Sequence, residues 1–219
     1  MIAIVIPSLG EVDLQWSLCF SQVVRNTSHE LTIFTSKHYR LDWARNLAVM
    51  EALKQQPSHL LFWDSDIIPC MVTKEGLQLF TRAIDYMLEL NYPVVSAVYY
   101  TSKLLPNCFD YVGGKEIFRP VNLSELKGKR FFCDGVGLGF CLIDARVFSV
   151  IEPPWFEYKV ELSKKANRYS IREVSEDLNF CLRLHEHGFK VFCLGELWCR
   201  HIHKFSILEP GKFELVPTR

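Results

Sequence analysis

Hydrophobic positions follow two different periods along the first half of the chain. Short apolar runs rich in β-branched side chains predict strands, and between them apolar residues recur at helical spacing. The predicted strands are Ile2 to Ile6, Glu30 to Ser36, Leu60 to Trp63 and 93 to 100, and the predicted helices run from a cap at Asp42 to about Gln56 and from a cap at Thr73 to about Leu90. Strands that alternate with helices are typical of βαβ units and of an α/β fold with a mostly parallel sheet.

The second half of the chain is less regular. Residues 101 to 130 have little periodicity and predict long loops or short irregular strands, and residues 152 to 174 predict a mobile loop. The elements predicted beyond them are a strand from Phe140 to Ile143 with Asp144 as a helix cap, a helix from the cap Ser175 to Gly188, and two late strands, FKVFCL and LWCRHIH. The length of 219 residues is that of one domain, 1 to 219.

Composition and charge narrow the classes of partner. Lys+Arg and Asp+Glu are equal at 25 each, so no field of one sign recruits nucleic acid or an anionic membrane, and a charged ligand must be held locally. The first apolar run is too short for a signal peptide, and no later run approaches the roughly 18 apolar residues of a membrane span. We therefore expect a cytoplasmic protein without a transmembrane segment.

The 8 cysteines are scattered, and none forms a CxxC pair that would indicate zinc. Most lie inside apolar runs, so we expect buried, reduced thiols that pack as small hydrophobic side chains. A disulfide such as Cys133 to Cys141 is the alternative.

Two acids, Asp64 and Asp66, directly follow the predicted strand LLFW. The carboxyl ends of strands gather at one rim of an open α/β sheet, where Ser8 is also expected. Two acids at such a strand end need a cation or a polar network, and Mg²⁺ or Mn²⁺ bridging a diphosphate supplies one. The alternative is a turn in which both carboxylates only accept hydrogen bonds from backbone amides.

Three further polar groups carry candidate chemistry. Arg45 and Asn46, in the helix before the acidic strand, could reach a phosphate, although an exposed helix arginine is the simpler interpretation. Glu176 and Asp177 open a helix, where acids also complement the helix dipole. His201 and His203 flank Ile202 in a predicted late strand, so side-chain alternation puts both histidines on one face and Ile202 on the other. The two histidines are candidate metal ligands or ordinary polar residues.

The ordered series of segments resembles GT-A fold glycosyltransferases, especially those of the family 2 type. The matching segments are the first strand with IPS, ARNLAV, LLFWDSDIIP, VVSAVYY, DGVGLGFCLI, PPWF, SEDLNFCLRLHEHGFKV and a closing histidine, and they cover nearly the whole chain from Ile2 to His203. The chain departs from the family after its second strand, where ELTIFTSKHY lacks the usual acid that holds the base. Glu11 and Asp42 are the available substitutes.

The resemblance implies roles for individual residues. Asp64 would lie nearer the ribose and Asp66 on the metal in a DxD motif, with His201 or His203 completing the metal site. Asp177 would be the general base, with Glu176 as its substitute. The residues implied in nucleotide-sugar binding are Pro7, Ser8, Arg45, Asn46, Asp64, Ser65 and Asp66, and those that would shape the acceptor and sugar site are Asp134, Gly135, Gly137 and Trp155.

The implied activity is transfer of a sugar from a nucleotide-diphosphate donor to an acceptor hydroxyl, dependent on Mn²⁺ or Mg²⁺ and inverting at the anomeric carbon. A retaining course is the alternative if Asp177 lies too far from the acceptor. Residues 1 to 100 would bind the nucleotide, and residues 101 to 219 the glycan, protein or lipid-linked acceptor, in the cytoplasm or at its membrane surface. The alternatives are a non-catalytic module that binds sugar nucleotides or glycans, a DxD-type phosphatase, and a nucleotidyltransferase. A nucleotidyltransferase would need a glycine-rich, basic loop after the first strand, which SLGEVDLQ is not.

Overall fold

A computed structural model describes residues 1–8, 10–37, 40–101, 105–113, 118–122, 125–165, 168–202, 205–209 and 212–215. The helices are α1 Leu14–Arg25, α2 Leu41–Leu53, α3 Ala83–Glu89, α4 Val147–Val150 and α5 Glu176–Glu186. The first strands are β1 Ile2–Pro7, β2 Leu31–Ser36, β3 His59–Trp63, β4 Ile67–Ile68, β5 Cys70–Thr73, β6 Gly76–Leu79, β7 Val94–Val98, β8 Cys108–Tyr111 and β9 Phe118–Pro120. The later strands are β10 Arg130–Cys133, β11 Gly135–Val136, β12 Phe140–Asp144, β13 Lys159–Lys165, β14 Arg168–Val174, β15 Val191–Trp198, β16 Arg200–His201, β17 Phe205–Glu209 and β18 Lys212–Leu215.

The central sheet is mixed and mostly parallel in direction, which confirms the predicted α/β class. Its strand order is β2-β1-β3-β12-β7-β15-β5-β6, and β10 adds to β15. Strands β2, β1 and β3 pair in parallel, as do β7 and β15, whereas β12 runs antiparallel between β3 and β7. The carboxyl ends of β1, β3, β7 and β15 therefore meet at one rim.

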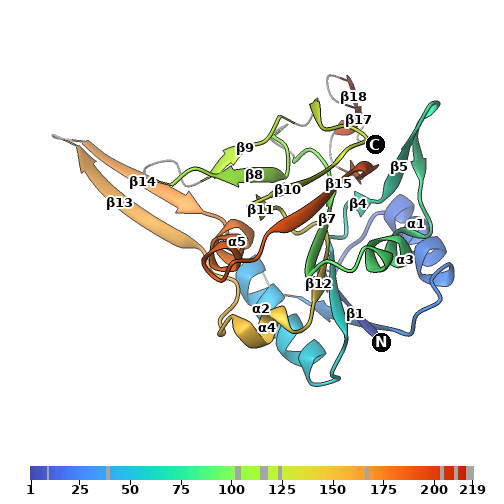
Figure 1. Cartoon of the computed structure of the whole chain (residues 1–219), viewed down its shortest axis with the longest axis horizontal. Coiled ribbons are helices and arrows are strands. Elements are labelled where there is room, and N and C mark those ends of the chain that lie inside the picture. The colour runs from blue at the N-terminus through green and yellow to red at the C-terminus, as the bar shows by residue number, and fades with distance from the viewer. Residues whose placement is uncertain are drawn as a thin grey trace.

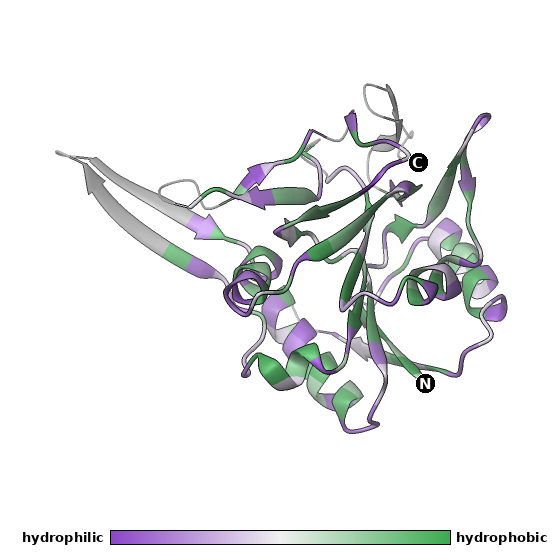
Figure 2. Cartoon of the chain, viewed as in Figure 1, coloured by the Kyte–Doolittle hydropathy of each residue, from purple (hydrophilic) through white to green (hydrophobic). Residues whose placement is uncertain are grey.

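Helices cover both faces of this sheet (Figure 1). On one face α1 and α3 pack against the side chains of one hydrophobic cluster, and on the other α2, α4 and α5 pack against a second cluster. Figure 2 shows the hydrophobic residues concentrated on the central strands. The central strands β1, β3, β7, β12 and β15 are buried on both faces, and this is why their runs in the sequence are continuous rather than alternating.

Helix α1 is not among the elements that the sequence analysis predicted. Asp13 caps it by accepting a hydrogen bond from the Gln15 backbone N–H at 2.6 Å, and the apolar positions Trp16, Cys19 and Val23 recur at helical spacing on its buried face. The N-cap residue and this spacing are signals that the sequence does contain.

The helix predicted from 73 to 90 is wrong in its first half. Strands β5 and β6 form a hairpin there, and the helix begins only at Ala83. Thr73 shapes the turn instead of capping a helix, because its hydroxyl accepts from the Glu75 N–H and donates to the Gly76 carbonyl. Gly76 has a φ of 114°, which glycine adopts without strain.

Three smaller expectations are also corrected. Strands β13 and β14 pair antiparallel where the sequence predicts a loop, and they project from the body in Figure 1. Asp144 ends β12 and accepts hydrogen bonds from Arg146. The N-cap residue of the short helix α4 is Arg146, so Asp144 is not the helix cap. Asp42 lies inside the first turn of α2, after the N-cap Arg40.

Other predicted elements are confirmed. Ser175 is the N-cap residue of α5, and Gly188 follows its end with a φ of 78°. The 101 to 130 segment contains the short strands β8 and β9. All 8 cysteines are buried and free. Among the described residues, no helix combines the length and the apolar character that crossing a bilayer requires.

Candidate active site

Asp64 and Asp66 lie at the rim of the central sheet, directly after β3. The Asp64 N–H donates to the Gly139 carbonyl at 2.9 Å, and the Asp64 carbonyl accepts from the Trp16 indole N–H at 3.0 Å. These backbone contacts tie the strand end both to the turn before β12 and to helix α1. The carboxylates are thus carried on a fixed segment of backbone.

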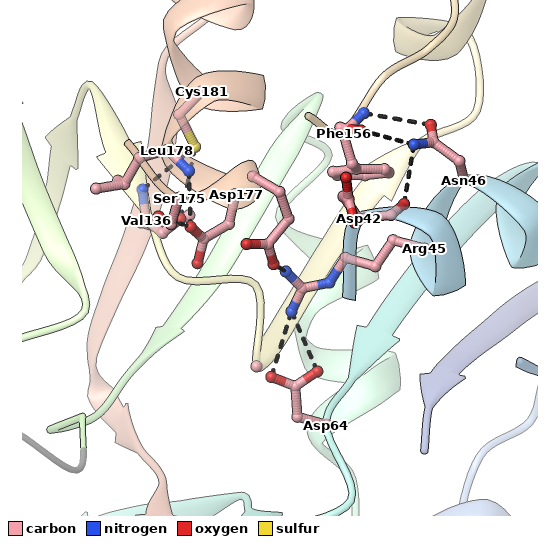
Figure 3. Close-up of polar contacts among 12 residues, drawn as sticks. Asp42, Arg45, Asn46, Asp64, Val136, Phe156, Ser175, Asp177, Leu178 and Cys181 are labelled. Atoms are coloured by element: carbon pink, nitrogen blue, oxygen red, sulfur yellow. Dashed lines mark hydrogen bonds and ion pairs between the residues drawn. The ribbon is translucent and has the colours of Figure 1, made fainter. Parts of the chain in front are cut away.

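Arg45 is buried on the α2 side of Asp64 (Figure 3). One guanidinium nitrogen lies 3.3 Å and 3.4 Å from the two Asp64 carboxylate oxygens, and the other bonds the Glu176 carboxylate. Arg45 and Glu176 are only 2% and 3% exposed at their side chains, whereas Asp64 is 27% exposed. Arg45 is therefore not the exposed helix arginine of the simpler interpretation but a buried cation shared by two acids.

Asp66 pairs with His201 on the other side of the strand end. The His201 Nε2 lies 3.0 Å from Asp66 Oδ2, and its Nδ1 lies 3.0 Å from the Tyr100 carbonyl. A carbonyl only accepts, so Nδ1 carries a proton and Nε2 faces the carboxylate. That arrangement requires either a second proton on the ring or a cation shared with Asp66. Burial lowers the pKa of His201, but its contacts with Asp66 and Tyr100 outweigh burial and raise it overall.

Asp177 faces the same rim from the start of α5. Its Oδ1 accepts from the Ser175 hydroxyl and from the Leu178 N–H at 2.8 Å, which fixes the side chain. Its Oδ2 points toward Gly137, where a Cβ would lie 3.5 Å from that oxygen and 2.7 Å from the Tyr99 hydroxyl. A side chain at Gly137 would collide with Tyr99, so glycine is needed there.

Tyr99 lies behind these acids. Its hydroxyl accepts the Gly139 N–H at 2.9 Å, and its ring meets the His201 ring edge on, with centroids 5.8 Å apart. Burial raises the pKa of Tyr99 well above its ordinary value, and the nearby Asp64 and Asp177 raise it further. Sequence reasoning did not single out Tyr99. Its place at the carboxyl end of a predicted strand was the available signal.

The site carries an excess of negative charge. Asp64, Glu176 and Asp177 act on one guanidinium, that of Arg45, and Asp66 adds a further acid beside Asp64. Burial raises the pKa of Asp64, and Asp66 and Asp177 add to this rise, while Arg45 opposes it. Burial also raises the pKa of Glu176, and Asp177 adds to this rise, while Arg45 opposes it. A diphosphate would be repelled here unless a cation came with it.

Asn46 and Trp155 hold the PPWF segment against α2. The Asn46 amide donates to the Phe156 carbonyl at 2.7 Å and accepts from the Trp155 N–H at 2.9 Å. Trp155 is 5% exposed, its indole N–H bonds the Ile151 carbonyl, and it lines a pocket of about 430 Å³ beside Trp43. Both residues lie on the α2 surface rather than beside Asp66.

The remaining predicted residues divide between the rim and the neighbouring strands. Asp134 accepts from the Tyr111 N–H at 3.0 Å and lies 3.5 Å from His185, and Gly135 packs against Phe118, where a Cβ would lie 2.9 Å away. Ser65 is half-buried in the turn between the two acids. His203 lies outside the described residues.

A second pocket of about 450 Å³ opens beyond the ends of β1 and β2. Ser8, Thr35, Lys37 and Trp16 line it, and Trp16 connects it to the Asp64 carbonyl. Pro7 is buried at the end of β1 next to it. The substitutes considered for a base-binding acid do not line it: Glu11 is exposed, and Asp42 is buried and paired with Arg40.

Comparison with known proteins identifies the fold. No protein-family model and no curated protein matches the sequence. The crystal structure of A197 from STIV superimposes with a TM-score of 0.63 over 100% of this chain and 95% of its own, at 21% identity. The crystal structure of GalNAc-T7 with UDP, GalNAc and Mn²⁺ superimposes with a TM-score of 0.50 over 93% of this chain, at 8% identity, and this chain spans 44% of it. The fold is that of GT-A glycosyltransferases, as the sequence resemblance implied.

Proposed function

We propose that this chain is a metal-dependent glycosyltransferase that moves a sugar from a nucleoside diphosphate to an acceptor hydroxyl. The observation that carries the proposal is the pairing of Asp66 with His201 at the rim of a GT-A fold. Two ligands at right angles on an octahedral metal with bonds of about 2.1 Å lie about 3.0 Å apart. The separation of Asp66 Oδ2 and His201 Nε2 is 3.0 Å, so the pair fits Mn²⁺ or Mg²⁺.

Asp66 and His201 would hold the metal, and Asp64 would stay on Arg45 and face the ribose. When bound, the metal would stabilise the charge that develops on the departing diphosphate. The His201 Nδ1–H bond to the Tyr100 carbonyl supports this role, because such a bond fixes the ring so that Nε2 points at a metal. The pocket lined by Ser8, Thr35 and Lys37 is where the nucleoside would lie.

Asp177 would be the general base. Its Oδ2 faces the turn at Gly137 while Oδ1 is held by Ser175 and Leu178, so one oxygen is positioned to accept the acceptor hydroxyl proton. Glu176 is held on Arg45 deep in the core, which makes it a positioning residue rather than a second base. A base on the face opposite the leaving group would give inversion.

The test is a thermal-shift panel of nucleoside diphosphates with and without Mn²⁺, beginning with UDP because GalNAc-T7 is crystallised with UDP and Mn²⁺. A ligand at 100 times its Kd should raise the melting temperature by about 5 to 10 °C, and only when metal is present. Asp66→Asn should abolish the metal-dependent rise in melting temperature. A panel without any metal-dependent shift would overturn the proposal.

Asp177→Asn separates an enzyme from a binding module. The variant should bind the donor like wild type, while its kcat for sugar transfer should fall by about 10² to 10⁴. The Asp177→Asn protein keeps the size of the side chain, so its melting temperature serves as the folding control. A wild-type protein that binds donor and transfers no sugar to any acceptor in a glycan panel would favour the binding module.

A further inference from the structure

Three buried thiols meet where the 105 to 136 region joins the central sheet. Cys108 begins β8, Cys133 ends β10, and Cys193 lies in β15. The Cys193 sulfur lies 3.8 Å from that of Cys108 and 3.3 Å from that of Cys133, and all three sulfurs lie within 4.8 Å of one another. Their exposed fractions are 0%, 2% and 0% for Cys108, Cys133 and Cys193.

The spacing of these sulfurs is close to that of ligands on one metal ion. A thiolate binds Zn²⁺ at about 2.3 Å, and two such sulfurs at the tetrahedral angle lie about 3.8 Å apart. Within the described part of the chain, this trio is the group of three potential ligand side chains whose ligand atoms all lie within 4.8 Å of one another. The roles proposed for Asp66, Asp177 and His201 do not involve these three cysteines.

The contacts among the three sulfurs also suit a cation. The Cys133 and Cys193 thiols share a hydrogen bond, and the Cys108 thiol donates to Cys193. Burial raises the pKa of Cys108 and of Cys193. A bound cation would replace these weak thiol contacts with metal–sulfur bonds and would stabilise the deprotonated sulfurs that burial disfavours.

We propose that Cys108, Cys133 and Cys193 form a structural site for one thiophilic d¹⁰ cation, Zn²⁺ or Cu⁺. Sulfur ligands select these ions over Mn²⁺ and Mg²⁺, so the site is chemically distinct from the oxygen-rich rim. Binding forms metal–sulfur bonds and releases the proton of each coordinating thiol to solvent, with no change in oxidation state. Cu⁺ is satisfied by three sulfurs, and Zn²⁺ would take a fourth ligand, for which the Gly135 carbonyl, 3.3 Å from the Cys133 sulfur, is placed.

Such an ion would join three segments that are far apart in sequence. It would tie β8 and β10 to β15, which leads directly to His201. Asn107, next to Cys108, bonds the Tyr99 N–H through its side-chain carbonyl at 2.9 Å. The site would thus hold the second half of the chain in register with the strands that carry the rim.

The experiment uses the full chain, prepared without oxygen and with any metal-binding tag removed. Metal content is measured by mass spectrometry of the elements, and the metal-free protein is titrated in separate arms with Zn²⁺, with Cu⁺, and with Cd²⁺ as a spectroscopic probe. We expect one ion per chain, a thiolate-to-Cd²⁺ charge-transfer absorption, and a rise in melting temperature of roughly 5 °C or more. The arm with the tighter binding identifies the ion.

Alanine variants locate the ion. Cys133→Ala and Cys193→Ala should each weaken binding by at least about 10-fold, and the control Cys141→Ala, which removes a fully buried thiol from the same core, should keep it. Alkylation with mass mapping gives a second readout on unaltered protein, in which Cd²⁺ should protect the thiols of Cys108, Cys133 and Cys193 selectively.

The proposal is overturned by wild-type protein that binds none of the three ions, by equal loss of binding in Cys141→Ala, or by protection of other cysteines. It is also overturned if anaerobically prepared protein is two hydrogens lighter because Cys133 and Cys193 form a disulfide.

Discussion

Asp64 and Asp66 are two residues apart, yet one belongs to a buried charge cluster and the other to the exposed rim of the sheet. Asp64 joins a buried cluster in which the Arg45 guanidinium is shared with Glu176, so its charge is compensated inside the protein. Asp66 lies at the surface of the rim, 35% exposed at its side chain, and it contacts the titratable imidazole of His201. In the proposed function, Asp64 would therefore help to hold the fold together, whereas Asp66 would be presented to the metal.

The largest expected effect comes from removing the buried cation. Arg45→Met leaves the buried Glu176 and the partly buried Asp64 without their cationic partner. The free energy of unfolding should fall by about 3 to 5 kcal/mol. Urea unfolding measures this change. The matched control is Arg146→Met, because Arg146 is 89% exposed and its pair with Asp144 is screened by solvent, so stability should hardly change.

Arg45→Met combined with Glu176→Met removes both buried charges together. The double variant should recover part of the stability lost in Arg45→Met. If Arg45→Met is as stable as wild type, the cluster is not the compensated, fold-stabilising region that the comparison requires.

The second effect concerns the exposed acid. Asp66→Asn keeps the shape of the side chain but removes the charge, so Mn²⁺ affinity should fall by about 100-fold, which is about 2.7 kcal/mol. The free energy of unfolding without metal should stay close to that of wild type. Isothermal titration with Mn²⁺ and urea unfolding measure the two quantities, and a variant that loses stability but not metal affinity would reverse the assignment of roles.

The third effect concerns Tyr99, which lies between the Asp64 cluster and His201. Tyr99→Phe removes the acceptor of the Gly139 N–H and leaves that buried donor unpaired, at a cost of about 1 to 2 kcal/mol in the free energy of unfolding. Tyr92→Phe, at a tyrosine that is 38% exposed, is the control. Equal stability of both variants would show that the Gly139 turn is held by its other contacts.

The sequence predicts most strands of the central sheet and the acidic rim because those signals are local. Continuous apolar runs mark strands covered on both faces, and a polar residue that ends such a run must lie at an edge. The pairing of Asp64 with a buried Arg45 was not predictable in this way. It depends on Arg45 and Glu176 meeting across 131 positions of sequence, and no local pattern encodes that contact.

The same reasoning explains the errors in element assignment. Leu77, Phe80 and Ile84 fit a helical period, so the pattern predicts a helix where β5 and β6 form a hairpin, and the turn chemistry of Thr73 and Gly76 prevails over that period. The charged residues of β13 and β14 obscure the alternation of Val160 and Leu162, so the sequence predicts a loop there.

The smallest effect is the pH dependence of the exposed pair. The pKa of His201 is raised overall: burial lowers it, but the contacts with Asp66, the Tyr100 carbonyl and Asp64 outweigh that, and the Tyr99 ring packs on the remaining side. In metal-free protein the charged pair therefore stabilises the fold fully below the ordinary histidine value of 6.5 and loses this contribution as the pH rises through the raised pKa.

The contribution should stay below about 1 kcal/mol because solvent screens the half-exposed Asp66. Urea unfolding of wild type and His201→Gln across this pH range measures it, and the difference should shrink as the pH rises. In the Asp66→Asn background the same comparison should lose its pH dependence. A difference that grows with pH would mean that His201 is held neutral, and Asp66 would then have to be neutralised by another group at the rim.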